Sequence, residues 1–433
     1  MTELRPSLGL THATAMVVGT IIGASIFVQP SEITRQMPSV WGIVVAWLGA
    51  GVLTLTGALV CAELSSAFPR TGGVYVFLTE AWSPALGFLW GWAMFWSMHS
   101  GIIAAIATVF ARYAAYFYPM SAVGLRLVAV GVILVLSAVN YVGVRHGGFV
   151  QNLFTAAKLT AIVAIVGAGL AWRGPAPVSA VTSTEISPRG LILAIAAGLF
   201  AYGGWHMVTY SAGETKDAAR TIPRALIIGT LVVTACYAGL NAIYLRVLPL
   251  EAVRESTRVA ADAADVLLEG HGAAIMAVLV MVSTFGAVNG IILVGPRVYY
   301  SMARDGLLFQ GVAAVHPAFG TPHRAIVLQA IWASVLALTN TYSALFSRVV
   351  YTEWIFFALM AAGLMRLRRR PGYQPAYRLV GYPLIPLAFI VASVVIAGIQ
   401  MRAALRDSLL GLGIVLMGLP VYFVWSRPRS ANE

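Results

Sequence analysis

The segment Gly198–Trp205 reads GLFAYGGW and interrupts a stretch without Asp, Glu, Lys or Arg that runs from residue 190 to residue 213. A second segment, Gly19–Phe27, reads GTIIGASIF and lies in the first apolar stretch, residues 8–28. Glycine costs about 1 kcal/mol in a helix interior, so a helix can break at either segment. Taken alone, each segment fits close helix packing through small residues equally well.

The residues around these segments identify a membrane protein. Of the 433 residues, 59% are apolar and 10% are charged, whereas about a quarter of the residues of a soluble globular chain are charged. About 20 apolar residues in a helix span the hydrocarbon layer. Reading from charge to charge predicts twelve helices, at residues 8–28, 41–62, 84–111, 127–144, 149–172, 190–213, 225–245, 272–303, 325–346, 349–365, 381–401 and 408–426. The expected fold class is therefore an all-α membrane protein with twelve transmembrane helices.

The charged residues give the expected organisation and orientation. No linker or charge run divides the chain, so residues 1–433 are expected to form a single transmembrane domain. An even number of spans places both termini on one side, and basic loops mark the cytoplasmic side. If the termini are inside, the inner segments carry more Lys and Arg than the outer segments, above all at Arg366–Arg370. Both termini are therefore predicted to be cytoplasmic. The net charge of +12 is assigned to these loops, and no nucleic-acid binding is expected.

The two glycine-rich segments become more informative as a pair. They lie in the first and the sixth predicted helices, at corresponding places in two five-helix halves. Interrupted helices at matching repeat positions indicate a binding site near the bilayer midplane. A half-helix N-terminus offers N–H groups and the preceding C-terminus offers carbonyls, so such a site suits a zwitterion.

Several motifs resemble the amino acid-polyamine-organocation superfamily, and within it the L-type amino acid transporters and their bacterial relatives. The resemblance covers nearly the whole chain, and Gly198–Trp205 is its most specific match. The other matching segments are Gly19–Phe27, Ala62–Gly73, Phe154–Leu159, Phe285–Gly290 and Gly411–Tyr422. The resemblance implies a leucine-transporter-type fold with inverted repeats at residues 8–172 and 190–365 and two added helices at 381–426. It also implies a secondary amino acid transporter, without a cofactor, that works by alternating access.

The resemblance further implies where the substrate binds. The α-carboxylate is expected at the backbone N–H groups of Gly23, Ala24 and Ser25, and Phe200 is expected to be the gate that covers the substrate. The α-ammonium is expected at the carbonyls of Ile21, Phe200, Ala201 and Gly203. Relatives usually end the first-helix triplet in glycine, whereas this chain has Ser25, which narrows the pocket or adds one hydroxyl.

Lys158 lies near the middle of a predicted span, where a charge costs about 2.5 to 3.5 kcal/mol on insertion scales. A lysine at this depth is too far from either interface to reach it easily. The resemblance implies that Lys158 contacts the unwound part of the first helix, where sodium-coupled relatives hold an ion. Transport is therefore expected to be independent of sodium, by exchange or by proton coupling.

Glu353 is the clearest departure from the family, whose members commonly have Asn at this place. A buried carboxyl must be neutralised by a proton or by a cation. Glu353 is therefore interpreted as a structural carboxyl, as a proton site, or as the partner of a polar or cationic substrate side chain. His206 is expected to make structural hydrogen bonds. Glu63 and Arg70 are expected to form an ion pair at a cytoplasmic loop or a contact at a helix end.

The sequence also bears on other functional classes. No His-Glu-x-x-His, Gly-x-Ser-x-Gly or intramembrane aspartate pair is present, so neither an enzyme nor a metal site is expected. The favoured substrates are neutral amino acids. The alternatives are a permease for cationic amino acids or polyamines that uses Glu353, and an amino acid sensor that does not transport.

The expected setting follows from the loops and tails. Relatives that pair with a heavy chain carry a cysteine in the outer loop at 113–126, and this chain has none there. No disulfide-linked heavy chain is expected, the protein is expected to be a monomer or a weak dimer, and the expected location is a bacterial inner membrane. Trp82, Trp90, Trp172 and Trp425 are expected to lie in the interface belt.

Overall fold

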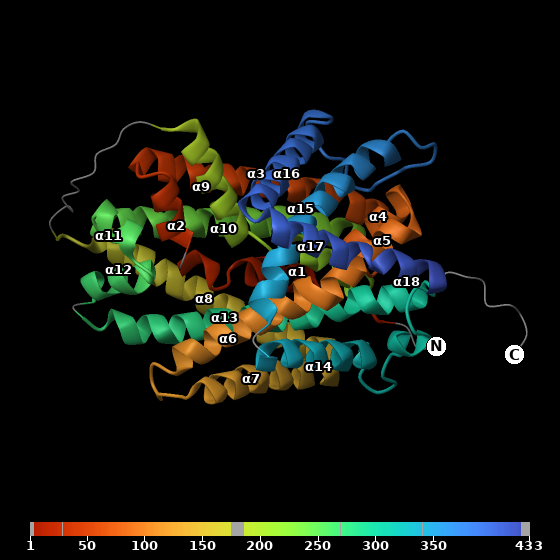
Figure 1. Cartoon of the computed structure of the whole chain (residues 1–433), viewed down its shortest axis with the longest axis horizontal. Coiled ribbons are helices and arrows are strands. Elements are labelled where there is room, and N and C mark those ends of the chain that lie inside the picture. Colours follow the sequence, from red (N-terminus) through yellow and green to blue (C-terminus); the bar gives the residue numbers. More distant parts are fainter. Residues whose placement is uncertain (1–3, 28, 175–185, 269, 340, 426–433) are drawn as a thin grey trace, which may run out of the picture.

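The computed structural model describes residues 4–27, 29–174, 186–268, 270–339 and 341–425, and the regular elements of these residues are helices. Ten helical stretches within them are long and apolar enough to cross a membrane, and Leu10–Ile21 and His323–Thr339 are shorter apolar helices. The all-α membrane class is thus confirmed. Figure 1 shows most of the long helices running along one common axis.

The first half of the chain begins with an interrupted helix. Its helices are α1 (Leu10–Ile21), η1 (Ser25–Phe27), α2 (Gln29–Gln36), α3 (Val40–Ala67), α4 (Val74–Ala81), α5 (Pro84–Ala93), η2 (Met94–Met98), α6 (His99–Ala114), α7 (Ala122–Val142) and α8 (Val144–Ala171). The π-helical turn η2 joins α5 and α6 into one long stretch.

The second half repeats the interruption in its first helix. Its elements are α9 (Pro188–Ala201), η3 (Trp205–Glu214), α10 (Ala218–Val247), α11 (Leu250–Glu255), α12 (Val259–Leu267), α13 (Gly272–Arg304), η4 (Gln310–Ala313), α14 (His323–Thr339) and α15 (Tyr342–Leu367). Three further helices follow, α16 (Leu384–Ala403), α17 (Leu405–Leu416) and α18 (Gly418–Trp425).

Several predicted helix ends were wrong because charged residues do not end a helix. The helix expected at 225–245 is α10, which begins at Ala218 and carries exposed Arg220 in its first turn. The helices expected at 325–346 and 349–365 are α14, which ends at Thr339, and α15, which begins at Tyr342. The hydroxyls of Thr339 and Thr341 lie 2.9 Å apart at this polar junction.

Helix α1 lies in the centre of the bundle, where it contacts α8, α10, α13 and η3 (Figure 1). Its C-terminal half is fully or nearly fully buried, as are most residues of α13. The first helix break is therefore surrounded by protein, which is the condition under which irregular backbone is tolerated at membrane depth.

The N-terminal segment is tied to the end of η3 by backbone hydrogen bonds of Ser7 and Leu8. Their N–H groups donate to the carbonyl of Glu214 at 2.8 and 2.9 Å, and the N–H of Lys216 donates to Leu8 at 2.8 Å. The Glu214 carboxylate in turn pairs with Arg297 on α13, with Nε and Oε2 2.6 Å apart and both side chains fully buried. We call this the closed end of the bundle.

One expected ion pair was wrong. Glu63 does not pair with Arg70: it accepts hydrogen bonds from Nε of Arg368 at 2.7 Å and from the N–H of Leu379 at 2.8 Å, while Arg70 pairs with Glu80 at 2.6 Å. The Glu63 carboxylate raises the pKa of Arg368, which lies just beyond α15.

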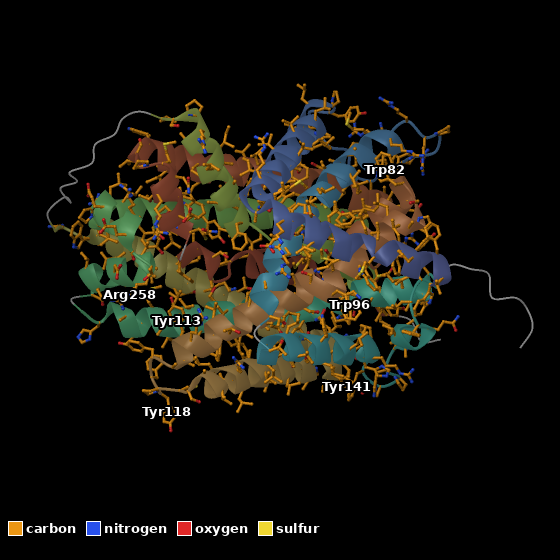
Figure 2. All side chains as sticks on the ribbon, viewed as in Figure 1. Trp82, Trp96, Tyr113, Tyr118, Tyr141 and Arg258 are labelled. Carbon is orange, nitrogen blue, oxygen red and sulfur yellow. The ribbon has the colours of Figure 1, made fainter. Side chains whose placement is uncertain are left out.

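The aromatic belt needs one correction. Trp90 is not at an interface, because it is fully buried among the rings of Phe356, Phe357 and His206. Other aromatic residues do lie near the ends of the bundle: Figure 2 shows Tyr118 toward one end and Trp82 and Tyr141 toward the other.

Candidate functional site

The first helix is broken where the sequence predicted it. Helix α1 ends at Ile21, the N–H of Gly23 donates to the carbonyl of Ile21 at 2.9 Å, and η1 begins at Ser25. Among the described residues, no hydrogen-bond partner is found for the N–H groups of Ala24 and Ser25. This turn therefore offers two donors at the start of a short helix, which favours an anion.

The second break follows Ala201, the last residue of α9. The turn contains Gly203, whose N–H donates to the carbonyl of Phe200 at 3.3 Å, and Gly204, which has a φ of +101° and precedes η3. A Cβ at Gly204 would lie 3.0 Å from the carbonyl oxygen of Thr20. Glycine is required here by both the positive φ and the close approach of α1.

The two breaks lie against each other. The hydroxyl of Thr20 donates to the carbonyl of Gly204 at 3.2 Å. The hydroxyl of Tyr237, on α10, lies 3.2 Å from the carbonyl of Ile21 and 3.0 Å from that of Ala201. The Tyr237 hydroxyl thus contacts two of the four carbonyls that were predicted to bind the substrate ammonium. Sequence reasoning missed Tyr237 because an aromatic residue in an apolar helix gives no local signal.

The predicted binding residues differ in exposure, so one side of the breaks is open. Ala24 and Ser25 are partly buried, Gly203 is exposed, and 47% of Phe200 is exposed. The role of Phe200 as a gate stays a prediction.

Lys158 reaches the first break from α8. Its Nζ donates to the carbonyls of Gly19 at 3.2 Å, Ile22 at 2.6 Å and Ser283 at 3.2 Å, and only 1% of the residue is exposed. The hydroxyl of Ser283 also lies 3.2 Å from the carbonyl of Ile22. The three N–H groups of the Lys158 ammonium thus donate to three carbonyls. These hydrogen bonds hold the positive charge at the break.

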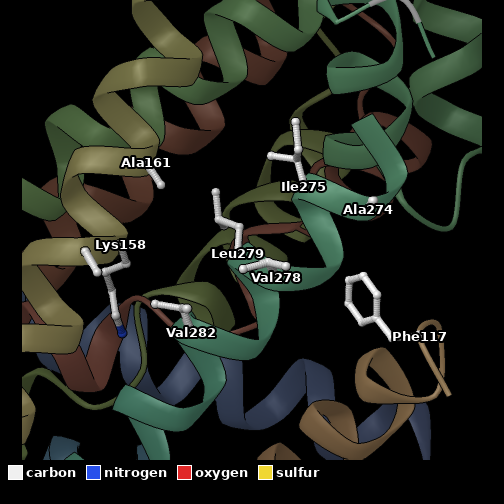
Figure 3. A pocket seen from close by; sticks show the side chains of 9 residues that line it. Phe117, Lys158, Ala161, Ala274, Ile275, Val278, Leu279 and Val282 are labelled. Atoms are coloured by element: carbon white, nitrogen blue, oxygen red, sulfur yellow. The ribbon is translucent and has the colours of Figure 1, made fainter. Parts of the chain in front are cut away.

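An apolar cavity of about 420 Å³ flanks the stem of this lysine, between α8 and α13. Figure 3 shows Nζ turned away from Ile275 and Phe117, which line the cavity. The cavity therefore surrounds the hydrocarbon part of the side chain, while the charge points to the helix break.

Glu353 faces the second break from α15. Its Oε1 lies 3.6 Å from Nε2 of His206 in η3, and 16% of its side chain is exposed. His206 is fully buried, and neither of its nitrogens has a hydrogen-bond partner among the described residues. The expectation that His206 makes structural hydrogen bonds was therefore wrong.

Comparisons with known proteins cover almost the whole chain. The family model described as amino acid permease matches residues 8–419. The chain is 33% identical to the serine/threonine exchanger SteT of Bacillus subtilis, over 99% of this chain and 98% of that protein. It is 31% identical to the human b(0,+)-type amino acid transporter 1, over 98% of this chain and 88% of that protein. It is 32% identical to the human large neutral amino acids transporter small subunit 2, over 99% of this chain and 83% of that protein.

Proposed function

Because the chain belongs to the amino acid permease family, a family of membrane transporters and not of enzymes, we propose that it moves neutral α-amino acids across a bacterial inner membrane by alternating access. The observation that carries this proposal is the meeting of the two helix breaks, which brings N–H donors and carbonyl acceptors together in the protein interior. A zwitterionic amino acid needs both kinds of group.

The proposed architecture has twelve membrane spans in a single domain. The breaks after Ile21 and Ala201 support inverted repeats at residues 8–172 and 190–365, followed by two spans at 381–426. The two shorter apolar helices, α1 and α14, count as spans in this proposal, and the short helices η1 and α2 follow α1 in the chain. Both termini then lie on one side, which we assign to the cytoplasm.

In the proposed site, the substrate carboxylate binds the N–H groups of Gly23, Ala24 and Ser25. The ammonium binds the carbonyls of Ile21, Phe200, Ala201 and Gly203, two of which it shares with the Tyr237 hydroxyl. Phe200 covers the substrate after it binds. The hydrogen bonds of Leu8 to Glu214 and the exposure of Phe200 support an outward-facing conformation with a closed cytoplasmic end.

The proposed coupling does not use sodium. The ammonium of Lys158 occupies three carbonyls at the first break, and a second cation there would be repelled. Exchange of one amino acid for another and proton coupling both fit this arrangement.

The test is counterflow with the purified, full-length protein in liposomes. Liposomes loaded with unlabelled serine, alanine or leucine should accumulate the labelled amino acid from outside, and liposomes without protein serve as the control. Alanine methyl ester should compete poorly, because it lacks the carboxylate charge that the N–H groups at Ala24 and Ser25 favour. Binding without accumulation would identify a sensor instead, and equal competition by the ester would contradict the proposed site.

A further inference from the structure

A chain of buried polar side chains extends from Glu353 into the bundle. His206 lies next to Glu353, and its ring centroid is 5.6 Å from that of Tyr210. The Tyr210 ring is 5.5 Å from that of His99 on α6. Nδ1 of His99 lies 3.4 Å from the hydroxyl of Tyr299 on α13. We call His206, Tyr210, His99 and Tyr299 the imidazole cluster.

The cluster is buried, and most of its polar atoms have no protein partner. His99, His206 and Tyr210 are 0% exposed. Among the described residues, Nε2 of His99, both nitrogens of His206 and the hydroxyl of Tyr210 make no hydrogen bond. A buried polar group that is left without a hydrogen bond destabilises the folded protein.

Aromatic packing alone does not account for these residues. The rings of Trp90, Trp205 and Phe357 surround His206 at 5.7, 5.4 and 4.9 Å. A phenylalanine at 206 would pack against them without burying two polar nitrogens. Aromatic packing therefore gives no reason for the two nitrogens of His206.

The cluster leads toward the closed end. Tyr299 lies near the end of α13 at Arg304, about 8 Å from it at the helical rise of 1.5 Å per residue. In the same region the N-terminal segment and the Glu214–Arg297 pair close the bundle. The cluster thus extends from Glu353 toward the end of the bundle where these contacts lie.

Besides His206 and Tyr210 of η3, the titratable groups in or beside the cluster come from four helices. They are Glu353 of α15, His99 of α6, Tyr299 of α13 and Cys61 of α3. The side chains of Gln329, on α14, and His99 both lie close to Gly295. Arg297 is engaged with Glu214 and does not join the cluster.

We propose that Glu353 and the imidazole cluster form a proton pathway between the substrate site and the closed end of the bundle. This inference rests on the proposed function, because it gives that carrier a second, transported ion. The Glu353 acid passes its proton to Nε2 of His206, which leaves a carboxylate and an imidazolium. Nδ1 of His206 then releases a proton through Tyr210 or a bound water to Nε2 of His99. His99 passes the proton on Nδ1 to the Tyr299 oxygen, while the Tyr299 hydroxyl releases its own proton to water at the closed end. Each group accepts one proton and releases one.

The first step of the pathway is interrupted in this conformation. The 3.6 Å between Glu353 and His206 exceeds the 2.7 to 3.2 Å of ordinary hydrogen bonds. Proton transfer therefore requires η3 and α15 to approach each other by a few tenths of an ångström. Because η3 belongs to the broken helix at the substrate site, its movement ties proton transfer to the transport cycle and prevents a continuous leak.

The test compares proton flux with amino acid counterflow in the same liposomes. Full-length wild type, His99→Gln and Tyr299→Phe are reconstituted with the trapped pH dye pyranine, and external alanine, serine or leucine is added. His146→Gln is the matched control, because His146 is exposed at the start of α8. Tyr299→Phe removes one oxygen and keeps the ring, so it disturbs the packing less than His99→Gln does.

We expect amino acid addition to acidify wild-type and His146→Gln liposomes. Both cluster variants should lose about tenfold or more of the proton flux while they retain counterflow. Proton flux equal to wild type in Tyr299→Phe would overturn the pathway. Wild-type counterflow without proton flux would overturn it as well and leave the proposed function intact, whereas absent counterflow would overturn the proposed function itself.

Discussion

At the scale of single residues, Lys158 sets the charge of the first helix break. Lys158→Ala should abolish counterflow and lower thermal stability, because three buried carbonyls lose their donor at a cost of about 1 to 3 kcal/mol each. The control is Lys216→Ala, because Lys216 is exposed. Wild-type counterflow should be unchanged when choline replaces sodium, and strict sodium dependence would disprove the assignment.

Tyr237 holds the two breaks together through one hydroxyl. Tyr237→Phe should raise KM for a neutral amino acid about three- to tenfold, because a lost hydrogen bond of about 1 kcal/mol leaves the carbonyls of Ile21 and Ala201 less fixed. Tyr244→Phe is a close control, since Tyr244 is buried on the same helix and its hydroxyl has no partner among the described residues. Equal KM values for the two variants would assign Tyr237 to packing alone.

The two functional interpretations of Glu353, a proton site and a partner for a cationic substrate, predict different results. In the first case, Glu353→Gln should remove the pH dependence of alanine and leucine uptake between about pH 5 and 8, because the amide does not titrate there. In the second case, arginine should compete better than leucine in wild type and lose that advantage in the variant. Identical uptake of all three by variant and wild type at every pH would make Glu353 structural.

At the scale of helices, the break after α9 depends on Gly204. Gly204→Ala should abolish counterflow, because a left-handed residue other than glycine costs about 1 to 2 kcal/mol and the new Cβ would press on Thr20 at 3.0 Å. Gly398→Ala on α16 meets no atom within 4 Å and should leave counterflow unchanged. A fully active Gly204→Ala would show that the breaks need not touch.

At the scale of the whole molecule, Glu214 and Arg297 hold the closed end together. Glu214→Gln leaves the buried Arg297 charge without its counterion and should destabilise the protein by about 3 to 5 kcal/mol, seen as a lower melting temperature in detergent. Glu80→Gln breaks the partly exposed pair with Arg70 and should cost about 1 kcal/mol or less. Similar melting temperatures for the two variants would contradict this role.

The sequence by itself determined the membrane class, the two helix breaks and the depth of Lys158. Each depends on a local pattern: long apolar stretches, adjacent glycines, and one charge far from its neighbours along the chain. Helix ends were less accurate, as α10 and α15 show, because a helix continues past charged residues such as Arg220 and Arg348.

Only the tertiary structure decided which polar groups meet. Glu63 binds Arg368 and not nearby Arg70, Tyr237 bridges Ile21 and Ala201, and His206 lies beside Glu353. These partners are far apart in the chain, and burial forces each polar group to use whatever donor or acceptor the packing brings near. Spacing along one helix records none of those neighbours, so the breaks could be located from sequence while the contacts that hold them could not.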